Sequence, residues 1–300
     1  MEAPRGKTLG YTALALTAFA ANSLLCRRAL GHTALDPASF STIRLVAGAA
    51  VLVALTRATR RGEKTLGGSW GPACLLFLYA VPFSFAYVSL SAGTGALILF
   101  GAVQATMLAA ALVSGERPHI VQWTGLAIAL SGLVYLTMPG LTAPSRAGSA
   151  LMIVAGMAWG FYSLRGRHAA NAVAETAGNF VRAVPLAVAV SVLAAPHATW
   201  SGEGAILAAL SGAIASGLGY VVWFAALSGL TATSAASVQL AVPVIAAAGG
   251  VVFLAEPLTL RLTLAAILIL GGVGLALTRT GPRRPPPHPA AGPASGSPAP

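Results

Sequence analysis

Apolar residues run through the chain in long blocks separated by short polar connections. A bilayer core of about 30 Å requires roughly 20 apolar residues per helix, and most of the blocks reach that length. We therefore expect an all-α integral membrane protein. The pattern predicts ten membrane-spanning helices, at 8–26, 37–56, 70–91, 94–114, 119–138, 147–165, 176–195, 204–226, 232–254 and 260–278.

Composition agrees with this interpretation. Hydrophobic residues make up 56% of the 300 residues and charged residues only 8%, whereas a soluble domain carries about 25% charged residues. The chain has too few charges to cover a surface that faces water, which excludes soluble, disordered and collagen-like proteins. The expected surroundings are the lipid bilayer.

The net charge of +11 has a second explanation besides nucleic-acid binding. Basic residues control topology when they lie between membrane spans, and most of the Lys and Arg lie there. We therefore expect no nucleic-acid partner. The Pro-rich segment 279–300 has no hydrophobic period and is predicted to be a disordered cytoplasmic tail.

The chain contains an internal repeat. At an offset of 138 residues Arg27 falls on Arg165 and Arg44 falls on Arg182, and at an offset of 140 Glu116 falls on Glu256. The sequence thus predicts two five-helix halves, 8–138 and 147–278. Because five is odd, the second half enters the membrane from the opposite side. Such inverted repeats are a signature of secondary transporters.

The distribution of positive charge predicts the orientation. Twelve of the 18 Lys and Arg lie on the side of the N-terminus, four lie on the other side, and Arg44 and Arg182 lie inside predicted spans. Cytoplasmic loops carry the excess of Lys and Arg. We expect a multi-pass protein of the cytoplasmic membrane with both termini in the cytoplasm.

Three segments resemble a known family. SGERPHIVQWTGLAIALSGLVYL, LAEPLTLRLTLAAILILGGVGLAL and GMAWGFYSLRGR are similar to the EamA-type transporters of the drug/metabolite transporter superfamily, and the resemblance covers residues 8–278. It implies ten helices, inverted repeats and alternating access for small organic solutes, frequently in the export direction. Ala20-Ala21 stands where the family often has Trp-Gly, and Val103 where it often has Pro, so the substrate is not carried over.

No enzyme motif is present. The sequence contains no HExxH, GxSxG or Walker A pattern, and we expect no catalysis, no cofactor and no metal site. The leading hypothesis is a secondary transporter that exports amino acids or related small metabolites. The alternatives are a multidrug exporter of lipophilic cations, a passive channel and a membrane scaffold without transport activity. Coupling ion and oligomeric state stay open.

Charged groups in the spans are candidates for structural or gating roles. Arg44 and Arg182 lie within about two turns of predicted span starts, close enough for snorkelling, and each is expected to act as an anchor or as a substrate contact. Glu175 lies seven residues before Arg182 and is a candidate partner for it. Glu116 and Glu256 are expected to be helix-end carboxylates that fix a turn or bind a neighbouring Arg.

Uncharged polar and aromatic residues at membrane depth are the candidate substrate-binding groups, because hydrocarbon cannot satisfy their polar atoms. Of the two glutamines we expect at most one to face the substrate, and Pro243 favours Gln239 because it frees the backbone carbonyl four residues earlier. The predicted binding residues are Asn22, Ser23, Tyr79, Tyr87, Gln104, Trp159, Tyr162, Tyr220, Trp223 and Gln239.

Overall fold

The computed structural model describes residues 5–59, 66–113, 120–138, 143–166, 171–227, 229–230 and 238–277, and all regular structure within these ranges is helical. The first half contains α1 (Arg5–His32), α2 (Pro37–Thr59), α3 (Trp70–Tyr87), α4 (Ala92–Val113) and α5 (Ile120–Thr137). The second half contains α6 (Arg146–Gly166), α7 (Ala172–Ala194), the short 3-10 helix η1 (Ala195–His197), α8 (Gly202–Leu210), η2 (Ser211–Leu218), α9 (Gly219–Leu227), α11 (Ala241–Leu254) and α12 (Leu260–Leu277).

The expected all-α membrane protein is confirmed, whereas the count of ten spans is not. Within the described residues, six helices are long and apolar enough to cross a membrane: Gly6–His32, Pro37–Thr59, Trp70–Tyr87, Arg146–Gly166, Ala172–His197 and Gly202–Leu227. The other predicted spans contain shorter apolar helices, Ala92–Met107, Trp123–Thr137, Ala241–Leu254 and Leu260–Leu275.

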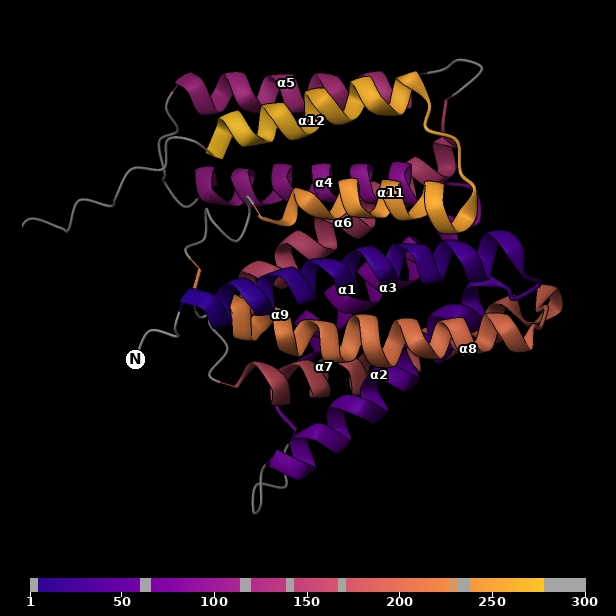
Figure 1. Ribbon diagram of the computed structural model, residues 1–300. Helices are drawn as coiled ribbons and strands as arrows, with labels where there is room; N and C mark the ends of the chain where they lie inside the picture. The colour runs from indigo at the N-terminus through magenta and orange to yellow at the C-terminus, as the bar shows by residue number, and fades with distance from the viewer. Residues whose placement is uncertain are drawn as a thin grey trace, which may run out of the picture.

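The contacts between helices have the symmetry of a duplicated fold. In the first half α3 and α4 pack on α6, and in the second half α9 and α11 pack on α1. Likewise α7 packs on α3 while η2 packs on α2. The remaining large contacts join counterparts: α2 to α7, α4 to α11 and α5 to α12. Figure 1 shows the α5–α12 pair at one edge of the bundle, with α1 and α3 near its middle.

Two helices depart from the predicted regular spans. The span 204–226 is a continuous helix whose middle, η2, is wound as a π-helix over Ser211–Leu218. The span 232–254 is not one α-helix, because α11 begins at Ala241 after a turn at Leu240. Pro243 therefore lies in the first turn of α11, where its missing N–H costs α11 no hydrogen bond. Pro243 still supplies no N–H to the backbone carbonyl of Gln239, as expected.

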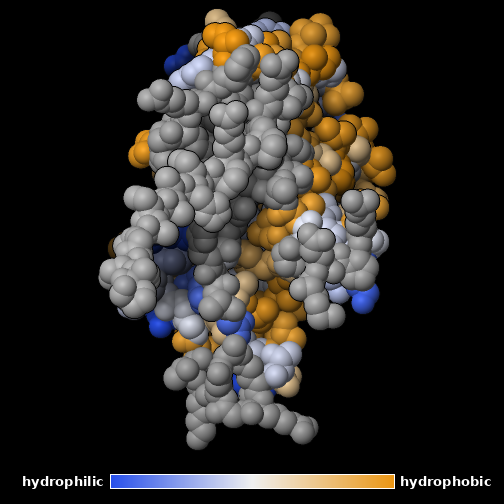
Figure 2. Space-filling model, turned by 90° about the vertical axis from the view of Figure 1, so that its left-hand side faces the viewer, coloured by the Kyte–Doolittle hydropathy of each residue, from blue (hydrophilic) through white to orange (hydrophobic). Residues whose placement is uncertain are grey.

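Large apolar side chains face outward along the helices. Leu9, Val192, Val252 and Ile267 are all more than 60% exposed, and the end-on view of Figure 2 shows hydrophobic residues along much of one flank of the molecule. An extended apolar exterior of this kind is typical of a surface that faces lipid. The exposed tryptophans Trp70, Trp123 and Trp200 lie at or near helix starts, as interfacial residues do.

Candidate functional site

A network of polar side chains crosses the middle of the bundle. Asn22 of α1 donates from Nδ2 to the Tyr79 hydroxyl of α3 at 3.2 Å, and Arg44 of α2 donates from Nη2 to the same hydroxyl at 3.1 Å. Both ends of the network meet on η2: Ser211 donates to Asn22 Oδ1 at 2.6 Å, and Ser216 accepts from Arg44 Nε at 3.2 Å. Five side chains thus join three helices of the first half to one helix of the second.

Arg44 does not snorkel, although its place near a span start left that possibility open. Its residue exposure is 1%, and its guanidinium carbon lies 5.1 Å from the centre of the Tyr79 ring and 4.9 Å from that of the Phe83 ring. The ion pairs among the described residues do not include it. Burying an unpaired charge costs several kcal/mol, of which aromatic faces and hydroxyls offset only a part.

The π-helix explains how two serines reach the network. Ser211 and Ser216 are five residues apart, which in an α-helix separates two side chains by about 140° around the axis. Hydrogen bonding from i to i+5 instead brings such residues to nearly the same face. Gly212 permits the approach of η2 to α2, because a Cβ there would collide with the backbone carbonyl of Arg44.

Aromatic rings from both halves pack against this network. Trp159 of α6 lies at the centre of the cluster, with its ring 5.0 Å from that of Tyr79 and 4.8 Å from that of Tyr220. Phe19 of α1 adds edge contacts to Trp159 at 5.8 Å and to Trp223 at 5.6 Å. All five rings are buried, so they form an aromatic cluster where the two halves meet.

Three buried polar atoms of this region lack a hydrogen-bond partner within the described chain: Arg44 Nη1, the Tyr220 hydroxyl and Trp223 Nε1. Nearly all buried polar atoms in folded proteins are satisfied by protein or water, and each exception requires an explanation. Two of the three are nitrogen donors that cannot accept a hydrogen bond. These donors without partners therefore suit a ligand that carries acceptor oxygens.

The other predicted binding residues are also buried. The Tyr87 hydroxyl donates to the Ala92 carbonyl at 3.3 Å and joins the end of α3 to the start of α4. The Tyr162 hydroxyl accepts from Asn179 Nδ2 at 3.4 Å, while its ring stacks on Trp159. Ser23, Gln104 and Gln239 are buried on α1, on α4 and just before α11.

Arg182 corrects an expectation. Its Nη1 atom donates to the carbonyls of Gly67 and Gly178, at 2.9 and 3.0 Å, and it does not pair with Glu175. Gly178 allows this contact because a Cβ there would collide with the Gly67 carbonyl. Arg182 thus holds the segment before α3 against α7, whereas its repeat counterpart Arg44 lies in the centre.

Of the two carboxylates predicted at helix ends, the structure describes one. Glu256, after the end of α11, pairs with Arg27 and accepts from the backbone N–H of Ala92 at 2.8 Å. Glu116 lies outside the described residues. Within the described chain, no three His, Cys, Asp or Glu side chains gather in a group that could hold a metal ion.

Several side chains of the site were not predicted. Phe19 and Phe83 stand in uniformly apolar blocks, where nothing in the pattern separates them from lipid-facing phenylalanines. Ser211 and Ser216 belong to a run of Gly, Ser and Ala that favours close helix packing, and the π-winding that turns both toward Arg44 has no signal in the sequence. Asn179 was detectable as an amide at membrane depth.

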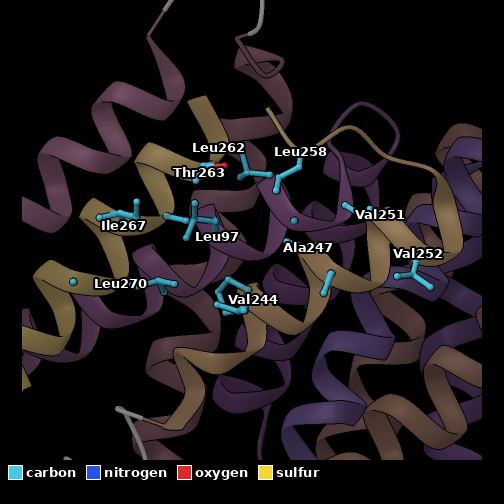
Figure 3. Close-up of a pocket in the computed structure, with 15 residues that line it drawn as sticks. Leu97, Val244, Ala247, Val251, Val252, Leu258, Leu262, Thr263, Ile267 and Leu270 are labelled. Atoms are coloured by element: carbon cyan, nitrogen blue, oxygen red, sulfur yellow. The ribbon is translucent and has the colours of Figure 1, made fainter. Parts of the chain in front are cut away.

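The pocket in Figure 3 is a different kind of feature. It has a volume of about 650 Å³ and lies between α4, α11 and α12, with Leu97, Val244, Ala247, Leu262 and Ile267 among its walls. Thr263 is the one hydroxyl among the lining side chains. A polar solute finds too few partners there to be oriented, so the central network is the better candidate site.

Comparison with known proteins identifies the family. The model of the EamA-like transporter family matches residues 7–138 and again residues 146–278. An uncharacterized protein of Pseudomonas aeruginosa is 51% identical over 276 residues, which are 91% of this chain and 96% of that protein. The uncharacterized transporter YoaV of Bacillus subtilis is 26% identical over 167 residues, 53% of this chain and 57% of that transporter.

A protein of known crystal structure shares the fold. Its TM-score is 0.65 and its sequence identity 20%, with 91% of this chain and 98% of that chain covered. The two consecutive matches to one family model agree with the duplicated helix contacts and with the apolar exterior. The chain belongs to the EamA-like transporter family and is a membrane transporter.

Proposed function

We propose that the protein is an alternating-access secondary transporter that exports amino acids or closely related small metabolites. The observation that carries this proposal is the central constellation, in which an amide, hydroxyls, a guanidinium and aromatic rings from both halves converge at membrane depth. Substrate sites of transporters built from inverted repeats lie near the midplane between the repeats. An amphipathic solute with polar and apolar parts matches the mixture of side chains.

Export of lipophilic cations is less well supported. A carboxylate near the aromatic cluster would favour such a cation, but the described acidic residues Asp36, Glu175, Glu203 and Glu256 all lie at or near helix ends. The buried charge closest to the rings of Tyr79 and Phe83 is the guanidinium of Arg44. A second cation beside it is repelled.

Counterflow in proteoliposomes tests the proposal against a channel and a scaffold. The panel contains labelled amino acids, nucleosides and quaternary ammonium compounds. A carrier accumulates label in exchange for unlabelled substrate, a channel conducts without this trans-stimulation, and a scaffold does neither. Trans-stimulated uptake of an amino acid supports the proposal, whereas trans-stimulation only by quaternary ammonium compounds contradicts the substrate class.

We place both termini in the cytoplasm. The basic residues favour this orientation, and the structure offers two exposed reporters: Arg57 in the last turn of α2 and His197 in η1. With Cys26 and Cys74 replaced by Ser, an impermeant thiol reagent should label His197→Cys and spare Arg57→Cys in right-side-out vesicles. The reverse pattern would invert the assignment.

A further inference from the structure

We infer that Arg44 binds the carboxylate of the transported solute, so that the substrate is an organic acid or amino acid rather than a neutral or cationic compound. This inference rests on the proposed transport function and assigns a role within the same site. It concerns Arg44 alone of the two repeat-related arginines, since Arg182 is held by backbone carbonyls.

The first argument is charge. Arginine stays protonated in proteins, and Arg44 is buried at the centre of the bundle without an acidic partner among the described residues. Its direct hydrogen-bond partners, Tyr79 and Ser216, are neutral hydroxyls. A carboxylate supplied by the substrate neutralises this charge inside the membrane, which no described side chain does.

The second argument is geometry. A guanidinium presents a planar fork that fits both oxygens of a carboxylate, and in Arg44 the Nη1 arm has no partner while Nη2 is bound to a hydroxyl. A carboxylate that approaches along this edge of the guanidinium accepts a hydrogen bond from the unpaired Nη1. It then replaces the weaker contact from Nη2 to Tyr79, whose hydroxyl keeps its hydrogen bond from Asn22.

The third argument is the composition of the unsatisfied atoms. Arg44 Nη1 and Trp223 Nε1 are donors only, and the Tyr220 hydroxyl can donate as well. A substrate ammonium group offers nothing to the two nitrogen donors, whereas carboxylate oxygens can accept from all three atoms. The apolar part of the solute then packs against the rings of Phe19, Trp159 and Tyr220, which already contact one another.

The test compares ligands that differ only in the carboxylate. Purified full-length protein is titrated with L-alanine, L-leucine and L-methionine and with the three corresponding carboxamides, followed by tryptophan fluorescence. None of these ligands fluoresces. With the exposed Trp70, Trp123 and Trp200 replaced by Phe, the signal comes from the buried Trp159 and Trp223. We expect at least one carboxylate to bind about tenfold to a hundredfold more tightly than its carboxamide.

Two further leucine analogues separate the carboxylate from the ammonium group. The acid 4-methylpentanoate keeps the carboxylate and should bind, whereas 3-methylbutylamine keeps only the amine and should not. Because these comparisons keep Arg44 intact, they do not depend on the folding of an Arg44 variant. Equal or tighter binding of every carboxamide, or no binding by any carboxylate, would overturn the inference.

Substitutions then assign the effect to the residue. Arg44→Gln should abolish the preference for carboxylate over carboxamide, Arg44→Lys should keep part of it, and the matched control Arg182→Gln should keep all of it. An undiminished preference in Arg44→Gln would contradict the assignment. Trans-stimulated nucleoside exchange that is equal in the unsubstituted protein and Arg44→Gln would overturn the carboxylate role while leaving transport intact. Carboxylate binding without counterflow of any solute would instead refute the transport function.

Discussion

Arg27 and Glu256 are 229 residues apart in the chain and lie 3.1 Å apart in the structure, measured between Nε and Oε1. The same Arg27 donates from Nη1 to the carbonyls of Tyr87 and Val88, and the other oxygen of Glu256 accepts from the N–H of Ala92. This one ion pair therefore ties the ends of α1, α3 and α11 to the start of α4. It joins the two halves at the end of the bundle opposite to the N-terminus.

Glu256→Gln should loosen this end of the bundle. The amide keeps the shape of the carboxylate but loses its charge, and a partly buried hydrogen bond to a charged group contributes about 1.5–3 kcal/mol. Cys26, next to Arg27 and fully buried, reports the opening. In a Cys74→Ser background we expect thiol labelling of Cys26 to become about tenfold faster.

Glu203→Gln provides the matched control for this experiment. Glu203 also pairs with an arginine of α1, Arg28, at 3.1 Å, but both side chains are about half exposed. Exposed ion pairs contribute little to stability, so the labelling rate should stay unchanged. Equal acceleration in both variants would mean that Cys26 responds to general loosening, and unchanged labelling in Glu256→Gln would show that the ion pair does not hold the end closed.

The burial of the predicted polar residues followed from one physical rule. Asn22, Tyr79, Tyr220 and Gln239 stand at membrane depth, where hydrocarbon cannot satisfy a polar atom, and all are buried. Family membership was likewise accessible, because the repeat and its motifs are local patterns. The rule states that a side chain faces protein but does not name its partners, which depend on how the helices cross.

The role of Arg44 shows where sequence reasoning ends. From the distance to the span start, snorkelling is as reasonable as burial. The decision depends on hydroxyls and rings that other helices supply, among them Ser216 at a separation of 172 residues and Phe83 from α3. The presence of Ser216 on that face depends in turn on the π-winding of η2, for which the sequence carries no pattern.

Gly212→Ala should disrupt the contact between η2 and α2. A Cβ at position 212 meets the carbonyl of Arg44, which is backbone and cannot rotate away. We expect a clear loss of thermal stability in detergent together with loss of transport. Gly274→Ala in α12 is the control, because a Cβ there meets nothing within 4 Å; its stability should be unchanged or slightly raised. Equal behaviour of the two variants would contradict the close packing of η2 on α2.

The two glutamines can be separated by a matched pair of substitutions. We predict that Gln239→Leu weakens substrate affinity in counterflow by about tenfold to a hundredfold, since a substrate polar group is left without its partner. Gln104→Leu should leave the affinity unchanged, because on the repeat framework the two amides point to different faces and only one reaches the substrate. The opposite result would assign the substrate contact to Gln104, and unchanged affinity in both variants would remove the glutamines from the site.

The hydrogen bond between Ser211 and Asn22 should stabilise the π-wound segment. It is the shortest bond of the central network, 2.6 Å from Oγ to Oδ1, and both residues are buried. Ser211→Ala leaves the amide oxygen of Asn22 without this donor, at a cost of about 1–3 kcal/mol. An α-wound segment would not allow the Ser211–Asn22 bond and the bond from Arg44 to Ser216 to form together. The substitution removes the first of these two bonds. We therefore expect η2 to relax toward α-winding.

Cys26 again supplies the measurement, because its labelling during a thermal ramp reports unfolding once Cys74 is replaced. Ser211→Ala should lower the unfolding temperature, and the exposed Ser131→Ala should not. A double-mutant cycle with Asn22→Ala isolates the bond, and we expect a coupling energy within the range of about 0.5–3 kcal/mol found for contacting residues. A coupling energy near zero would mean that Ser211 and Asn22 act independently. The winding of η2 would then rest on the packing of Gly212 against α2 instead.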